Sequence, residues 1–140
     1  MLTAKPIIYA MNLSEDNLSS GNSYSNQINE FASKEGAETI SVSAQLESEL
    51  IELGDEERLS YLDGIGVKEG GLNSLIRASY QLLGLRTYFT TGEKETRAWT
   101  INSGMKAPQA AGVIHTDFEK GFIRAQTIGY EKLLEVGSLS

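Results

Sequence analysis

The chain has 140 residues and a formal net charge of -7, with 40% hydrophobic and 22% charged residues, a globular composition that excludes wholesale disorder. The absence of cysteine excludes disulfides, thiolate metal sites and cysteine nucleophiles. No apolar run approaches the roughly 20 residues of a membrane-spanning helix, and no signal pattern opens the chain, so we expect a cytoplasmic protein without a membrane partner.

The charge is divided unevenly along the chain. Residues 1–85 carry 5 Lys and Arg against 13 Asp and Glu, whereas residues 86–140 carry 7 against 6. Clustered like charges usually lie on a solvated surface, which explains the acidic first half. The near-neutral second half is compatible with RNA binding.

The first half alternates strand and helix patterns. Short β-favouring runs at residues 5–12 and 39–43 predict two strands. Apolar residues at helical spacing predict a helix that ends at Gly36, a second helix with Leu46, Leu50 and Leu53 on its buried side, and further helices over residues 55–62 and 72–83. This alternation indicates an α/β fold.

The pattern changes after Gly84, where we place a domain boundary between residues 85 and 86. Residues 86–91 and 95–101 alternate like two strands joined by a glycine-bearing turn, which predicts a β-hairpin. Residues 107–114 predict a short helix with a proline in its first turn, and residues 122–128 predict a further strand. The second unit is therefore predicted to be ββαβ.

The loop after the first strand, Asn12-Leu13-Ser14-Glu15, has the form of the base-reading loop of P-loop nucleotide enzymes. The Asn12 amide offers a donor and an acceptor to purine ring atoms, the backbone of Leu13 can reach the base, and the Glu15 carboxylate selects a hydrogen-bond donor. Taken alone, such a segment is more often a turn followed by a helix cap.

The end of the second strand gives this loop its context, because ligands of open α/β sheets bind at the carboxyl ends of the strands. Ser43 and Ala44 follow that strand and lead directly into a helix. We therefore expect the two loops to enclose one flat base, with amides near Ser43 and Ala44 facing it.

His115 is the only histidine and has Asp117 and Glu119 nearby. One histidine without a cysteine partner is a poor metal-ligand set, and no nucleophile motif accompanies it. We therefore predict neither a metal site nor a catalytic residue, and favour a structural or RNA-contacting role for His115. The candidates for phosphate contacts are basic residues of the second half: Arg86, Arg97, Lys106, Lys120 and Arg124.

Three aromatic residues alternate on the predicted hairpin: Tyr88, Phe89 and Trp99. They are able to stack on bases, but aromatic strand residues more often build a core. No Gly-x-x-x-x-Gly-Lys-Ser/Thr segment occurs to cradle phosphates and hold magnesium. We therefore expect these 140 residues alone neither to hydrolyse nucleotide nor to bind a cofactor tightly.

Four stretches resemble the YchF, or Obg-like, ATPase family over essentially the whole chain: residues 2–15, Asp55-Glu-Glu-Arg58, Arg97-Ala-Trp-Thr-Ile101 and residues 106–125. The resemblance implies that Asn12 to Glu15 is a variant base-recognition motif, with Glu15 where ordinary GTPases carry Asp. In that family the variant goes with ATP use, often alongside GTP. The resemblance also implies that residues 86–140 are a TGS domain, a ubiquitin-like β-grasp module associated with RNA and the ribosome.

On this resemblance we expect an α/β fold: the terminal strand-helix units of a P-loop nucleotide-binding domain over residues 1–85, followed by a truncated TGS domain. The phosphate-binding loop would precede Met1. ATP or GTP with magnesium would serve the full-length protein, and the ribosome or RNA would be its partner. The apolar stripe Tyr130, Leu133 and Leu134 is expected either to dock as a helix on the open core or to swap into a neighbouring molecule. Of the consequences of an incomplete sheet, we favour self-association. The alternative is a stand-alone RNA- or protein-binding module without nucleotide chemistry.

Overall fold

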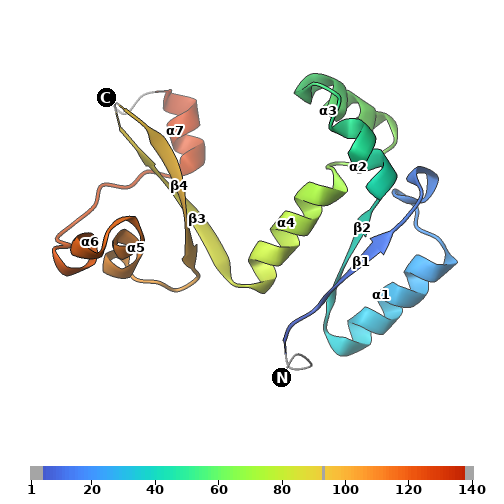
Figure 1. Ribbon diagram of the computed structural model, residues 1–140, viewed down its shortest axis with the longest axis horizontal. Coiled ribbons are helices and arrows are strands. Elements are labelled where there is room, and N and C mark those ends of the chain that lie inside the picture. Colours follow the sequence, from blue (N-terminus) through green and yellow to red (C-terminus); the bar gives the residue numbers. More distant parts are fainter. Residues whose placement is uncertain (1–4, 93, 138–140) are drawn as a thin grey trace. The chain divides into compact units, whose positions relative to one another are not determined.

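The computed structural model describes residues 5–92 and 94–137. The chain divides into two compact units, Met1–Leu85 and Arg86–Ser140, and Figure 1 shows their elements in chain order. In the described residues no helix is both long and apolar enough to cross a membrane.

A two-stranded parallel sheet lies at the centre of the first unit. Strand β1 (Ile8–Asn12) pairs with β2 (Glu38–Val42), in a register that places Asn12 opposite Val42. Because both strands run in the same direction, their carboxyl ends lie at the same edge of the sheet. The two predicted strands are therefore formed.

Helix α1 (Ser23–Glu35) connects the two strands. It begins at a capping box, in which the Asn22 side chain accepts from the backbone N–H of Ser25 at 2.9 Å and the Ser25 hydroxyl oxygen accepts from the backbone N–H of Asn22 at 2.7 Å. It ends at Gly36, whose φ of 68° is the left-handed conformation that glycine adopts without strain. The glycine stop predicted from the sequence is confirmed.

The remaining helices of this unit are the 3-10 helix η2 (Glu15–Asn17), α2 (Ala44–Leu50), α3 (Asp55–Gly64) and α4 (Gly71–Leu82). The sequence pattern predicts a helix that includes Leu53. Helix α2 instead ends at Leu50. A small core forms where α2 and α3 meet, with Leu46, Leu50 and Leu62 buried.

Helices α1 and α4 cover opposite faces of the sheet (Figure 1). Tyr9 of β1 contacts Phe31 of α1, with ring centroids 5.9 Å apart. Val42 of β2 lies against Gly71 of α4, so closely that an added Cβ would be 2.8 Å from the Val42 Cγ1 atom. Tyr9 is paired with Thr39, so these two residues point to the same face of the sheet. Val42 is three residues after Thr39 and therefore points to the other face, since successive residues of a strand alternate between faces. The contacts of Tyr9 and Val42 thus lie on opposite sides of the sheet.

The second unit opens with the predicted hairpin, β3 (Leu85–Thr91) and β4 (Thr96–Asn102). The hydroxyls of Thr91 and Thr96 lie 2.9 Å apart, and the Gly92 N–H donates to the Glu95 carbonyl at 3.1 Å. A connection this short permits only antiparallel pairing. Three short helices follow: α5 (Ala107–Ile114), α6 (Thr116–Lys120) and α7 (Tyr130–Val136).

The strand predicted over residues 122–128 is wrong, because these residues have no regular secondary structure and Ile123 is 90% exposed. β-favouring residues extend the chain, but a strand also needs a neighbour with which to exchange hydrogen bonds. In the described part of this unit the sheet contains β3 and β4. Over the described residues of this unit, the predicted ββαβ order is therefore replaced by a hairpin followed by three helices.

The apolar stripe near the end of the described residues lies on α7. Tyr130 stacks on Phe89 of β3, with ring centroids 5.7 Å apart, so this helix docks on the hairpin of its own chain. Self-association through this segment stays a prediction.

Candidate functional site

The residues predicted to read a base meet at the carboxyl ends of β1 and β2. The Leu13 N–H donates to the Val42 carbonyl at 2.8 Å, which extends the pairing one residue beyond β1. The Asn12 side-chain Oδ1 accepts from the backbone N–H of Ala44 at 3.0 Å. This second bond joins the loop after β1 to the loop after β2, so Asn12 and Ala44 are held in contact.

The bond to Ala44 also fixes the orientation of the Asn12 amide, because only Oδ1 can accept from an N–H group. The Nδ2 group, with its two donor hydrogens, is therefore left for other partners. Asn12 is exposed, and among the described residues no protein acceptor is hydrogen-bonded to Nδ2. The loop thus presents one oriented donor to solvent.

Ser43 and Ala44 each form a hydrogen bond within the protein. Ser43 is 4% exposed and its hydroxyl accepts from the Leu46 N–H at 3.4 Å, which caps α2. The Ala44 N–H, expected from the sequence to face a base, is engaged by Asn12. What these two residues contribute to the edge is therefore a fixed backbone rather than a free donor from Ala44.

Glu15 opens the 3-10 helix that follows the loop. Its Oε1 atom accepts a hydrogen bond from the Tyr61 hydroxyl of α3 at 2.9 Å. That bond raises the pKa of Tyr61 above 10.0, assisted by burial and by the negative charges of Glu15 and Glu49. The hydroxyl therefore stays protonated and remains a donor at neutral pH. Sequence reasoning missed Tyr61, because nothing in the local sequence around it signals a partner 46 residues away.

Arg97 is one of the basic residues predicted to contact RNA, and its side chain packs over the aromatic ring of Trp99. Its guanidinium carbon lies 4.2 Å from the centroid of the Trp99 ring, a cation-π contact between residues on one face of β4. The Trp99 Nε1–H donates to the Thr90 hydroxyl at 2.9 Å, which fixes the indole in turn. The pair presents an ordered positive charge on the hairpin.

The other basic candidates lie on separate segments: Arg86 on β3, Lys106 before α5, Lys120 at the end of α6 and Arg124 in the irregular segment. All are exposed. In residues 5–92 and 94–137 none of them, nor Arg97, forms an ion pair.

His115 joins two helices and serves as a cap. It ends α5 and precedes α6, and its Nδ1 accepts from the Asp117 N–H at 3.2 Å. The same nitrogen lies 3.5 Å from the Asp117 carboxylate. A structural role for His115 therefore has a direct basis. In the described part of the chain no group of three or more His, Cys, Asp or Glu residues is arranged to hold a metal ion.

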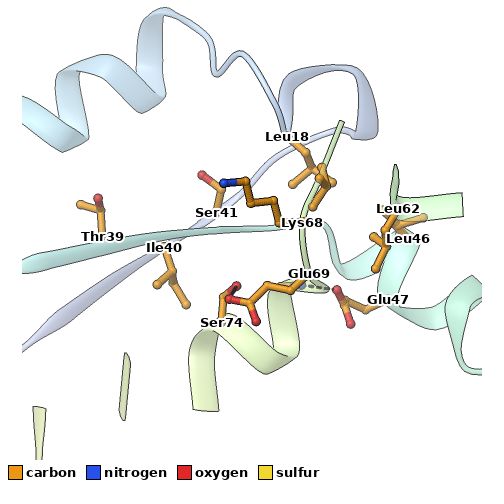
Figure 2. Close-up of a pocket in the computed structure, with 12 residues that line it drawn as sticks. Leu18, Thr39, Ile40, Ser41, Leu46, Glu47, Leu62, Lys68, Glu69 and Ser74 are labelled. Carbon is orange, nitrogen blue, oxygen red and sulfur yellow. Dashed lines mark hydrogen bonds between the residues drawn. The ribbon is translucent and has the colours of Figure 1, made fainter. Parts of the chain in front are cut away.

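A separate cavity of about 340 Å³ lies between β2, α2 and α4, as Figure 2 shows. Its acidic residues already have partners in the protein: Glu47 accepts from the Gly71 N–H at 2.5 Å, and Glu69 accepts from Ser74 and Arg77 at 3.1 Å and 2.6 Å. Neither Asn12 nor Glu15 lines this cavity, so it is distinct from the edge described above.

Comparison with known proteins connects these observations. Residues 85–140 match the family model YchF-GTPase_C, described as "Protein of unknown function (DUF933)". The whole chain is 54% identical to the "Ribosome-binding ATPase YchF" of Bacillus subtilis, of which it covers 39%. It is 47% identical to the "Obg-like ATPase 1" of Pongo abelii, with 98% of this chain and 35% of that protein covered.

A solved structure gives the same result. The Schizosaccharomyces pombe YchF GTPase matches 98% of this chain at 41% identity with a TM-score of 0.83, and the match covers 37% of that chain. The mixed α/β fold with small sheets is therefore similar to a YchF structure. The chain spans little more than a third of the length of the curated relatives it matches. The resemblance to the YchF and Obg-like ATPases that the sequence motifs indicated is confirmed.

Proposed function

We propose, from the match to the C-terminal portion of the YchF and Obg-like ATPases, that this chain supplies purine-base recognition to a cytoplasmic ATPase or GTPase that uses magnesium. The loops after β1 and β2 form the base site, with Asn12, Leu13, Glu15, Ser43 and Ala44 as its residues. The observation that carries the proposal is the 3.0 Å hydrogen bond between Asn12 Oδ1 and the Ala44 N–H. It joins the two loops and aims one donor group outward.

The chemistry of the edge suits a purine. The Asn12 Nδ2 group is able to donate to a ring nitrogen such as N7, and the Glu15 carboxylate is able to accept from an exocyclic amino group. The Leu13 side chain is largely buried, so this residue offers the base its backbone carbonyl. The Asn12 amide donor and the Glu15 carboxylate acceptor, three positions apart in the sequence, thus match the two kinds of group on a purine edge.

The proposal is tested by binding of ATP and GTP to the complete gene product, with Asn12→Asp as the variant. Aspartate keeps an acceptor for the Ala44 N–H but removes the Nδ2 donor. We expect affinity to fall by about 1–3 kcal/mol, the effect of losing one base contact, with an unchanged melting temperature. Unchanged affinity for both nucleotides would remove Asn12 from the site.

For residues 86–140 we propose a TGS domain that contacts the ribosome or RNA. Support comes from the exposed basic residues, which form no ion pair within the described part of the chain, and from the ordered Arg97 side chain over Trp99. The relatives named ribosome-binding ATPases agree with this assignment. Ribosome binding by a gene product that binds neither ATP nor GTP would instead favour the stand-alone binding module.

A further inference from the structure

The contact between Tyr61 and Glu15 joins the proposed base site to a helix far along the chain. Tyr61 lies on α3 and its hydroxyl donates to Glu15 Oε1 at 2.9 Å. Tyr61 is 39% exposed and Glu15 is half-buried. The bond therefore lies at the surface, where a ligand at the loop is able to reach the same carboxylate.

Helix α3 is held in place independently of this bond. Leu62, next to Tyr61, is buried with Leu46 and Leu50 in the core of the unit. One turn earlier, the Arg58 guanidinium donates from Nε and Nη2 to the Leu50 carbonyl at 3.2 Å and 2.9 Å. Since these contacts fix the helix, Tyr61 is presented to Glu15 by the fold, and Glu15 is the partner that adjusts.

The hydroxyl engages one of the two carboxylate oxygens. Guanine presents two adjacent donors, N1–H and the N2 amino group, which a carboxylate with both oxygens free accepts together. Adenine presents one amino donor, at N6, beside the N1 acceptor. With one acceptor position of Oε1 taken by the Tyr61 hydroxyl, Oε2 is the oxygen that Tyr61 leaves fully available to a base. One fully available oxygen matches the single donor of adenine.

We propose that Tyr61 is a positioning residue that favours adenine over guanine by occupying Oε1 of Glu15. The inference rests on the proposed function, since it requires Glu15 to meet the base. A ligand donor that approaches Oε1 must share that oxygen with the Tyr61 hydroxyl, so the second donor of guanine gains less there than it would from a carboxylate without this bond.

The test is equilibrium binding of ATP and GTP to the complete gene product carrying Tyr61→Phe. Phenylalanine keeps the ring and removes the hydroxyl, so we expect the ratio of the GTP and ATP dissociation constants to fall by about threefold to tenfold, the size of one hydrogen bond. Tyr24→Phe is the matched control, because Tyr24 is 76% exposed on α1, and it should leave the ratio unchanged. An unchanged ratio in Tyr61→Phe overturns the inference.

Glu15→Gln separates this inference from the proposed function. If Glu15→Gln changes neither dissociation constant, Glu15 does not meet the base and the inference is wrong. If the gene product binds neither nucleotide, the proposed function itself is wrong and the inference falls with it. If Glu15→Gln alters the ratio while Tyr61→Phe does not, only the role of Tyr61 is wrong. In the double variant we expect no further change beyond Glu15→Gln, because Tyr61 acts through Glu15.

Discussion

The side chain of Asn12 accepts a hydrogen bond from the backbone N–H of Ala44 at 3.0 Å, which couples the ends of two parallel strands through one amide. The same side chain carries the donor that we assign to base recognition. Its structural and its binding roles use different atoms, Oδ1 and Nδ2. Substitutions that remove one atom or both therefore distinguish the two roles.

Asn12→Ala removes both atoms and is expected to lower the free energy of unfolding by about 0.5–1.5 kcal/mol, the usual contribution of one hydrogen bond. The cost stays small because Ala44 is exposed and water solvates its freed N–H. Asn12→Asp keeps the acceptor and should unfold at the wild-type urea concentration. Equal destabilisation by the two variants would contradict the role assigned to Oδ1.

Arg58 is expected to stabilise the first unit far more than a surface arginine does. It is half-buried and makes two charge-assisted hydrogen bonds to the Leu50 carbonyl at the end of α2, whereas Arg77 forms an exposed ion pair with Glu69. Urea unfolding should give a loss of about 1.5–3 kcal/mol for Arg58→Ala and about 0–1 kcal/mol for Arg77→Ala. Similar losses in both variants would show that the Leu50 carbonyl is not an important partner.

The packing of α4 on β2 depends on the missing side chain of Gly71. A Cβ there would lie 2.9 Å from the Val42 Cα, a backbone atom that cannot rotate away. We expect Gly71→Ala to destabilise the chain by about 1–3 kcal/mol through overpacking. Gly64, at the end of α3, has no atom within 4 Å of its added Cβ, so Gly64→Ala is the control and should be neutral or stabilising in a thermal melt.

Much of the first unit was predictable because each local pattern matched the role of the segment in the sheet. Residues 5–12 contain a short apolar run, as parallel strands buried by helices do. Residues 39–43 contain β-branched residues, which favour a strand. Their parallel pairing also makes the meeting of Asn12 with the Ser43–Ala44 loop a direct consequence of topology. The identity of the strand-end residues was therefore accessible from the sequence.

The parts that failed depend on contacts between distant segments. Residues 122–128 have a strand composition, but they have no partner strand in the described part of the chain. The role of Tyr61 was not predicted, because its partner Glu15 lies far away in the sequence. The two residues meet only because Leu62 and Arg58 hold α3 against α2. Helix α6 was missed since its cap, His115, has an ambiguous local signal that also fits a catalytic or RNA-binding residue.

The ionisation of Tyr61 should report its bond to Glu15. Its pKa is raised by that hydrogen bond first, then by burial and by the charges of Glu15 and Glu49. A raised pKa means that the protonated form is favoured in the folded state, so this stabilisation is complete below pH 10.0 and is lost as pH rises through the folded pKa.

Glu15→Gln should therefore move the pKa of Tyr61 back toward 10.0. NMR titration of labelled tyrosine ring carbons measures this directly. Tyr9 is the internal control, because its pKa is raised by a hydrogen bond to Glu35 and should not respond to Glu15→Gln. If the Tyr61 titration is the same in wild type and variant, the hydrogen bond is not formed in solution.

Ribosome association is expected to depend on the basic residues of the second unit. Arg97 is held over Trp99 at 4.2 Å, and Lys106 and Arg124 are exposed. Contacts to phosphates are electrostatic and weaken as salt rises. In the complete gene product, replacing Arg97, Lys106 and Arg124 by Glu should therefore abolish co-sedimentation with ribosomes while ATP and GTP binding persists.

The control for that variant must carry the same change of charge elsewhere. Lys5, Lys34 and Arg77 are exposed residues of the first unit, so replacing these three by Glu tests whether net charge alone decides the result. We expect this control to retain ribosome binding and its salt dependence, because none of its three replaced residues is among the proposed phosphate contacts. If both triple variants lose binding equally, bulk charge governs association. If the Arg97, Lys106 and Arg124 variant still co-sediments, these three residues do not form the ribosome-binding surface.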